Sequence, residues 1–175
     1  MTTTSRTDAA ERTAAPVVRR QAMTATQLSI SLASLFAGVI HLAVAPEHLE
    51  EWWVYGAFFV AIGLFQVAFA LVVVRRPTWP VALTGIAVNL AVVLVWVVSR
   101  TRGLPITPTE DITSHVGTHL IEGVGPPDLA ATGAELLVVC LLVTLLPPRI
   151  RRLTVNVLLA TGVCLWALRL TGGLG

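Results

Sequence analysis

The sequence predicts an all-α membrane protein, a bundle of five transmembrane helices in a single domain. Of its 175 residues, 55% are hydrophobic and only 13% are charged. The apolar residues form five continuous runs, each close to the ~20 residues that cross ~30 Å of hydrocarbon as a helix. The runs do not alternate with polar residues, as the strands of a membrane β-barrel would. We therefore expect a multi-pass protein of the plasma membrane.

The first two spans follow a polar segment. Residues 1–22 are rich in Thr, Ala and Arg and show no hydrophobic periodicity, so we interpret them as a disordered cytoplasmic tail before a transmembrane domain at 23–175. The first span covers 24–45 and the second 53–74. Trp52 and Trp53 at the start of the second span are aromatic residues typical of a membrane interface.

Proline residues separate the remaining spans, which cover 80–99, 129–146 and 153–171. The long loop between the third and fourth spans is stiffened by several prolines. Pro147 and Pro148 predict a tight turn between the fourth and fifth, because proline cannot continue the preceding helix.

The orientation of the chain across the membrane follows from its basic residues, which are all arginine because the chain has no lysine. Four of the twelve precede the first span, two follow the second, and three join the fourth to the fifth. Only Arg100, Arg102 and Arg169 lie elsewhere. The positive-inside rule makes the side with nine arginines cytoplasmic. We therefore expect a cytoplasmic N-terminus and an extracytoplasmic C-terminus.

The first span has one competing interpretation. Arg19-Arg20, the apolar run 28–42 and the Ala43–Ala45 triplet together imitate a twin-arginine signal with an A-x-A cleavage site. Signal peptides have apolar regions of about 7–15 residues, whereas this run is long enough to span, and four more spans follow. We therefore expect the first span to be retained.

Titratable residues gather on one side of this predicted topology. All four histidines and eight of the ten carboxylates lie at or near the extracytoplasmic ends of spans. They are His41, His48, His115, His119, Glu47, Glu50, Glu51, Glu110, Asp111, Glu122, Asp128 and Glu135. In so apolar a chain, this clustering indicates a binding site at the outer rim of the bundle.

On the first span, small residues and histidines share one helix face, because they follow one another at steps of three or four. They are Ser34, Gly38, His41, Ala45 and His48. Small residues at this spacing let neighbouring helices approach closely, so this face should point into the bundle. His41 lies ~6 Å below the predicted outer boundary. We expect Pro46 to end or kink the helix before His48.

Glu135 is the most informative single residue, because it lies six positions inside the fourth span, ~9 Å deep. Ionisable residues at such depth cost about 2–3 kcal/mol on insertion scales and are functional by default. Two structural alternatives are a salt bridge with Arg100 and a protonated carboxyl hydrogen-bonded to Asn89. Asp128 lies seven residues earlier on the same face, at the surface.

The second and third spans also carry small and polar residues on one face. On the second these are Gly56, Gly63 and Gln66, and on the third Gly85, Asn89, Trp96 and Arg100. Neutral amides in membrane helices often serve as interhelical hydrogen-bond partners, so Gln66 and Asn89 are expected to have this structural role.

The loop between the third and fourth spans contains a second group of candidate ligands. If this stretch is helical, His115, His119 and Glu122 project from one face, a spacing that suits a divalent metal. Gly117 lowers the helix propensity, and a solvated polar loop is the alternative.

Three stretches resemble a group of small actinobacterial polytopic membrane proteins that have no assigned activity. They are HLAVAPEHLEEWWVYGAFFVAIGLFQ, WVVSRTRGLPI and EGVGPPDLAATGAE. The likeness covers the first four predicted spans and includes His41, His48, Gln66, Arg100, Glu122, Asp128 and Glu135. His115 and His119 lie in an elaboration of the loop that departs from the shared pattern. The resemblance implies a membrane protein and assigns no function.

The first functional hypothesis is a metal site at the outer end of the bundle. Its candidate ligands are His41, His48, Glu122, Asp128 and Glu135, with His115 and His119 as further candidates and Gln66, Asn89 and Arg100 as supporting polar residues. Imidazole and carboxylate together suit zinc, iron or copper, in a catalytic or a metal-transfer role. Haem is disfavoured because two histidines at matched depth on separate spans are missing.

Two other classes of function stay open. Glu135 and His41 could be protonatable groups in a proton or small-solute pathway. Alternatively, the chain could be a non-catalytic accessory subunit, with the rim charges contacting a partner subunit or a second copy. We expect no nucleic-acid partner, because the net charge of +2 is explained by the topology. The sequence assigns no catalytic residue, so enzymatic activity is left open.

Overall fold

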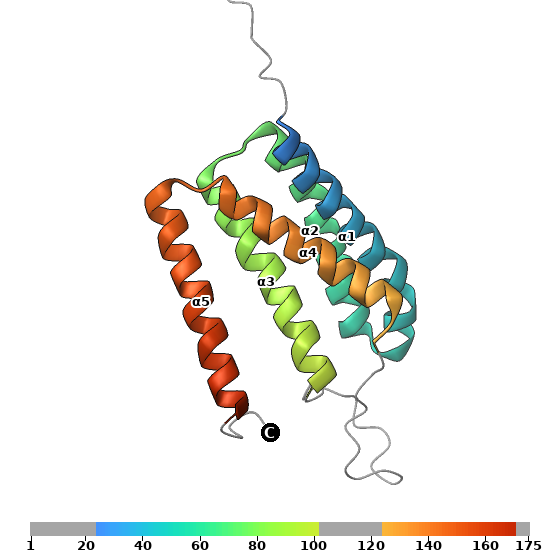
Figure 1. Cartoon of the computed structure of the whole chain (residues 1–175). Coiled ribbons are helices and arrows are strands. Elements are labelled where there is room, and N and C mark those ends of the chain that lie inside the picture. The colour runs from blue at the N-terminus through green and yellow to red at the C-terminus, as the bar shows by residue number, and fades with distance from the viewer. Residues whose placement is uncertain (1–23, 102–123, 171–175) are drawn as a thin grey trace, which may run out of the picture.

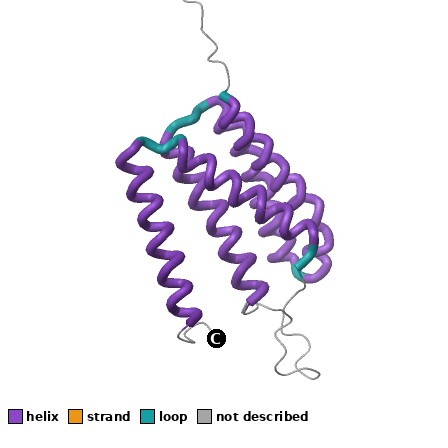
Figure 2. The backbone as a smooth tube through the Cα atoms, in the orientation of Figure 1, coloured by secondary structure: helices purple, strands orange, loops and turns teal. Residues whose placement is uncertain are grey.

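The computed structural model describes residues 24–101 and 124–170, which form five α-helices (Figure 1). These are α1 (Ala25–Glu51), α2 (Trp53–Arg75), α3 (Trp79–Thr101), α4 (Pro126–Thr144) and α5 (Pro148–Leu170). Figure 2 shows helices joined by short loops and no strand over these two ranges, which confirms the all-α prediction. The predicted tail, 1–22, lies outside the described residues.

Four of the described helices are long and apolar enough to cross a membrane. These are α1 to α4, which have 27, 23, 23 and 19 residues. At 1.5 Å per residue they are ~28–40 Å long, enough for the ~30 Å hydrocarbon layer. The prediction of a membrane protein is therefore supported by four helices. α5 contains the fifth predicted span but is not among the four.

Helix α1 starts where a capping box satisfies its first backbone groups. The Thr24 hydroxyl accepts a bond from the Gln27 backbone N–H at 3.2 Å, and the Gln27 side-chain oxygen accepts from the Thr24 N–H at 2.8 Å. This reciprocal pair holds two of the N–H groups that a helix leaves without an internal acceptor. The start of the helix therefore agrees with the start of the predicted span.

The expected break at Pro46 is wrong, because α1 continues through it to Glu51. The last turns are held on α2 by Leu49, whose side chain occupies the space that a Cβ at Gly56 would need. His48 adds a bond from its Nδ1 to the Val44 carbonyl at 3.0 Å. Packing and this side-chain bond offset the backbone hydrogen bond that proline removes.

Helices α1 and α2 form a tight antiparallel pair around two glycines. A Cβ at Gly38 would lie 2.9 Å from the Gly63 carbonyl oxygen, so the two backbones leave no room for a side chain. The hydroxyls of Ser31 and Ser34 each donate a 2.9 Å bond to an α2 carbonyl, those of Ala70 and Gln66. The small-residue face predicted for the first span is therefore an interhelical contact, as expected in lipid.

Helix α4 packs against both α1 and α3, while α5 stands at the edge of the group (Figure 1). No α5 side chain that the structure describes is buried. We call the end where α1 and α3 begin and α2 and α4 end the apolar end, because the hydrophobic core lies there. Its members include Ile30, Phe69, Val73, Ile86 and Leu142. The opposite end, which contains Arg100 and Asp128, is called the polar end.

Candidate functional site

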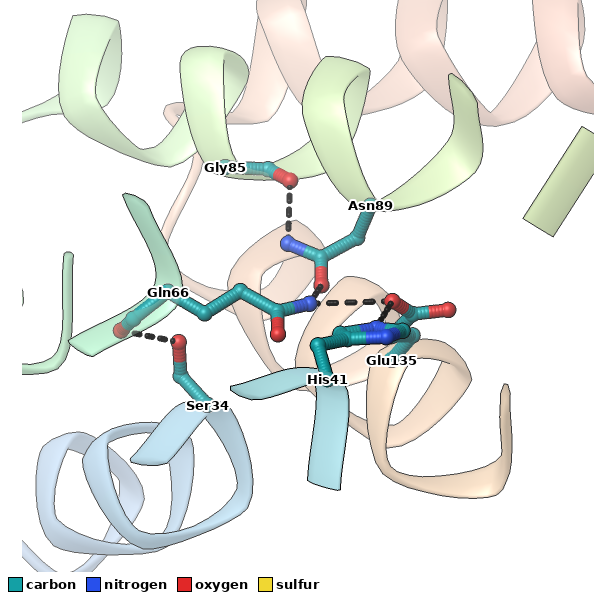
Figure 3. A network of polar contacts seen from close by, with 6 residues as sticks. All are labelled: Ser34, His41, Gln66, Gly85, Asn89 and Glu135. Atoms are coloured by element: carbon teal, nitrogen blue, oxygen red, sulfur yellow. Dashed lines mark hydrogen bonds and ion pairs between the residues drawn. The ribbon is translucent and has the colours of Figure 1, made fainter. Parts of the chain in front are cut away.

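Polar side chains from four helices meet at the centre of the bundle. Figure 3 shows His41 of α1, Gln66 of α2, Asn89 of α3 and Glu135 of α4 facing one another. Their exposed fractions are 6%, 0%, 1% and 1%. Each lies nine or ten residues from an end of its helix, which is ~14–15 Å along the axis. The four residues therefore form a polar centre that is buried in the middle of the bundle. We call this set the central network.

Glu135 is the acceptor on which the network converges. Its Oε1 lies 2.9 Å from His41 Nε2 and accepts a 2.9 Å bond from Gln66 Nε2. Gln66 Nε2 also donates to Asn89 Oδ1 at 3.3 Å, and Asn89 Nδ2 donates to the Gly85 carbonyl at 2.8 Å. Side-chain nitrogens from two different helices therefore meet on a single oxygen of Glu135.

The orientation of both amides follows from these partners. The Gly85 carbonyl can only accept, so the Asn89 nitrogen must face it and the Asn89 oxygen must face Gln66. Gln66 then presents its nitrogen to two acceptors, which uses both of its N–H groups. This order leaves Gln66 Oε1 buried with no hydrogen-bond partner among the residues that the structure describes. Both N–H groups of Gln66 are therefore used, while its buried oxygen is left without a partner among those residues.

The His41–Glu135 contact can carry a proton on either partner. At 2.9 Å, a proton between the two atoms belongs either to the imidazole Nε2 or to the carboxyl Oε1. An isolated charge at this depth is strongly unfavourable, whereas an imidazolium beside a carboxylate, or two neutral groups, leaves the pair without net charge. Losing one proton from either state gives the pair a net negative charge, which the Gln66 N–H helps to stabilise.

Arg100 and Asp128 form a second pair at the polar end, outside the central network. Arg100 Nη2 donates to Asp128 Oδ2 at 3.1 Å, and their side chains are 12% and 28% exposed. The same Asp128 oxygen accepts from the backbone N–H of Gly125 at 2.8 Å, so it also caps α4. The alternative of a Glu135–Arg100 salt bridge is wrong, because Arg100 pairs with Asp128, seven residues nearer the surface on α4. Glu135 accepts a hydrogen bond from the Gln66 amide, and Asn89 bonds to that same Gln66 amide.

Trp96 lies on α3 between these two groups. Its Nε1 is buried and has no hydrogen-bond partner within residues 24–101 and 124–170. It is one turn from Arg100 and two turns from Asn89 on the same helix face. A buried indole N–H normally finds an acceptor, so this atom, like Gln66 Oε1, is unusual among buried polar groups.

His48 does not join His41 and Glu135. Its Nδ1 bonds to the Val44 carbonyl, and its ring centroid lies 4.1 Å from that of Phe59. His41 lies against the same Phe59 ring at 5.6 Å. Phe59 therefore links the two histidines by packing, while only His41 bonds to the buried carboxylate.

The predicted metal ligands are thus divided among separate places. His41 and Glu135 are in direct contact, and Asp128 is paired with Arg100. His48 is bonded to the Val44 carbonyl of its own helix. Within the described ranges, no three His, Cys, Asp or Glu side chains are placed to hold a metal. The remaining candidates, His115, His119 and Glu122, lie outside these ranges.

The depth of the site also differs from the expectation of a rim. Because α1 continues six residues beyond the predicted boundary at residue 45, His41 lies ten residues from its end, ~15 Å along the axis. Gln66 and Asn89, for which an interhelical hydrogen-bonding role is predicted, belong to the same network as Glu135. The site is therefore a central one built from one residue of each of four helices.

Comparisons of the chain with protein-family models, with curated proteins and with solved structures give no match. The function has to be inferred from the geometry of the site. Among the described residues, the central network is where buried ionisable groups and buried unpaired polar atoms occur together.

Proposed function

We propose that this chain is a plasma-membrane protein that provides a proton pathway, with the His41–Glu135 pair as its proton-binding centre. The observation that carries the proposal is the 2.9 Å contact between an imidazole and a carboxyl group that are 6% and 1% exposed. Ionisable residues inside a membrane bundle are rare, and proton relays are one of the functions that they commonly mark.

The surrounding amides support a proton-binding role. Gln66 donates to Glu135 Oε1 and is itself held by Asn89, so the acceptor oxygen is fixed in position whatever the protonation state of His41. A proton can then be added to or removed from the pair with little rearrangement of the network. Preorganised dipoles of this kind stabilise a changing charge without moving.

A divalent metal such as zinc, iron or copper is the competing proposal. His41 and Glu135 supply two ligands of the required chemistry, but metal sites in proteins use at least three. Among the described residues the third ligand is missing, and Glu135 Oε1 already contacts His41 Nε2 and accepts a bond from Gln66. Elemental analysis of purified protein separates the proposals, since stoichiometric metal that disappears in Glu135→Gln would favour the metal site.

The proposal includes an orientation. We propose a cytoplasmic N-terminus, an extracytoplasmic C-terminus and α5 as the fifth span, on the basis of the arginine distribution. The polar end with Arg100 and Asp128 then faces out of the cell, and the apolar end faces the cytoplasm. The accessory-subunit alternative assigns the same topology but no proton movement.

Proton flux into liposomes tests the proposal. Purified protein is reconstituted around a trapped pH-sensitive dye, and a potassium diffusion potential drives protons inward. Wild-type protein should acidify the lumen faster than Glu135→Gln, because glutamine keeps the shape and cannot take up the proton. Glu50→Gln changes an exposed carboxylate at the end of α1 and should keep the wild-type rate. Equal fluxes in wild type and Glu135→Gln would contradict the proposal.

A further inference from the structure

The two halves of the bundle differ in what fills them. Toward the apolar end, bulky side chains from all four packed helices meet in one cluster that includes Ile30, Phe69, Val73, Ile86 and Leu142. Each is 4% exposed or less. Interiors packed in this way leave few voids larger than a water molecule. The cluster therefore separates the central network from the apolar end.

Toward the polar end, polar groups come close to the surface. Buried Ala45 of α1, Val92 of α3 and Ala131 of α4, which are 2%, 5% and 4% exposed, lie between the central network and this end. The polar end also carries the Arg100–Asp128 pair, which is partly exposed. This half therefore has a partly exposed ion pair at its end, whereas the other half is filled by the apolar cluster.

The relative positions of α3 and α4 place Trp96 between the Arg100–Asp128 pair and Glu135 along the bundle axis. The two helices run antiparallel, and the Arg100–Asp128 contact fixes which residues lie at the same level. From that pair, Trp96 is four residues inward on α3 and Glu135 seven inward on α4, ~6 Å and ~10 Å along the axis. The Trp96 N–H therefore lies between the surface pair and the central carboxylate.

Two buried polar atoms need a partner, Trp96 Nε1 in this region and Gln66 Oε1 in the central network. Gln66 is 0% exposed, yet its Oε1 has no donor within the described ranges, and Trp96 Nε1 has no acceptor there. Buried polar groups are normally paired with protein or with ordered water. An acceptor oxygen that lacks a donor and an N–H group that lacks an acceptor are the partners that ordered water molecules bind.

We infer that water enters the bundle from the polar end and reaches Glu135 past the Arg100–Asp128 pair and the Trp96 N–H, whereas the apolar end is dry. The inference deepens the proposed function, since it names water as the bound ligand and the side from which the proton is exchanged. Transfer to the other side then requires the apolar cluster to rearrange. The hydration itself does not depend on proton transport.

Cysteine reactivity in detergent micelles tests this asymmetry, because both ends are then open to the same reagent. Cys140 and Cys164 are exposed and are first replaced by alanine. Ala45→Cys and Ala70→Cys are then compared with a water-soluble thiosulfonate. The two alanines are 2% and 3% exposed and lie six and five residues from the ends of their helices at the polar and apolar ends, respectively.

The reactive species is the thiolate, which needs water around it. Ala45→Cys should therefore react about tenfold faster than Ala70→Cys or more, although it is buried equally and lies slightly deeper. Adding Asp128→Asn, which weakens the surface pair, should raise the rate at position 45 and leave that at position 70 unchanged. If Ala45→Cys does not fold, Ala131→Cys replaces it.

A smaller rate ratio, the reverse order, or an equal response of both positions to Asp128→Asn would overturn the inference. These outcomes leave the proposed function intact if proton flux still depends on Glu135. Conversely, the predicted labelling together with unchanged flux in Glu135→Gln would support a hydrated vestibule and reject the proton pathway. The two proposals therefore fail separately.

Discussion

Replacing His41 and Glu135 singly and together should reveal a coupling energy larger than that of a neutral hydrogen bond in a membrane. His41→Phe keeps a ring of similar size and removes both nitrogens, and Glu135→Leu removes the acceptor. Each single variant abolishes the 2.9 Å contact, so the double-mutant cycle isolates the interaction between the two side chains.

The expected magnitude follows from the burial of the pair. Neutral hydrogen bonds between membrane helices average about 0.6 kcal/mol and reach about 1.7 kcal/mol in such cycles. Hydrogen bonds to charged groups contribute about 1.5–3 kcal/mol. With exposed fractions of 6% and 1%, both partners are shielded from bulk solvent, so we expect a coupling energy in the range for charged groups, about 2 kcal/mol.

The assay is reversible unfolding in mixed micelles with increasing sodium dodecyl sulfate, followed by tryptophan fluorescence. Ser34→Ala supplies the internal reference, because it removes a neutral hydroxyl bond of the same 2.9 Å length to the Gln66 carbonyl, at 0% exposure. That variant should lose about 0.6 kcal/mol. A His41–Glu135 coupling no larger than the Ser34 value would refute the charged or proton-sharing character of the pair.

Two further predictions concern the packing of the bundle and its orientation in the membrane. Gly38→Leu should lower the free energy of unfolding by about 1–3 kcal/mol, because a Cβ there would lie 2.9 Å from the Gly63 carbonyl oxygen. Gly133→Leu, which has nothing within 4 Å of the added Cβ, should change it by no more than about 0.5 kcal/mol, as thermal unfolding will show. In intact cells, an impermeant thiol reagent should label Glu110→Cys and not Pro77→Cys. The reverse labelling pattern would invert the proposed orientation.

The direct contact of His41 with Glu135 follows from simple physical rules. Helical spacing assigns His41 to a face of small residues, which pack inward, and a carboxylate deep in an apolar run needs a partner. The contact satisfies both requirements. The pairing of Gln66 with Glu135 does not follow from such rules, because a neutral amide is compatible with any neighbouring helix and its partner depends on how the helices are rotated.

The end of α1 and the unpaired buried atoms cannot be predicted from the sequence, for two different reasons. Pro46 suggested a break, yet contact between Leu49 and Gly56, which are seven residues apart across a turn, stabilises the helix beyond it. The depth of His41 was underestimated as a result. The unpaired atoms of Gln66 and Trp96 depend on the full set of neighbours in three dimensions, since both residue types usually find partners when buried.

The central claim is that the His41–Glu135 pair binds and releases a proton, and counting protons tests it most directly. Purified protein in weakly buffered micelles is titrated from alkaline to acid pH over the whole range in which the fold persists, and the protons taken up are measured with an indicator dye. Wild type should take up about one proton per chain more than Glu135→Gln, while Glu50→Gln should match wild type. Equal uptake by wild type and Glu135→Gln would show that the pair is a fixed structural contact.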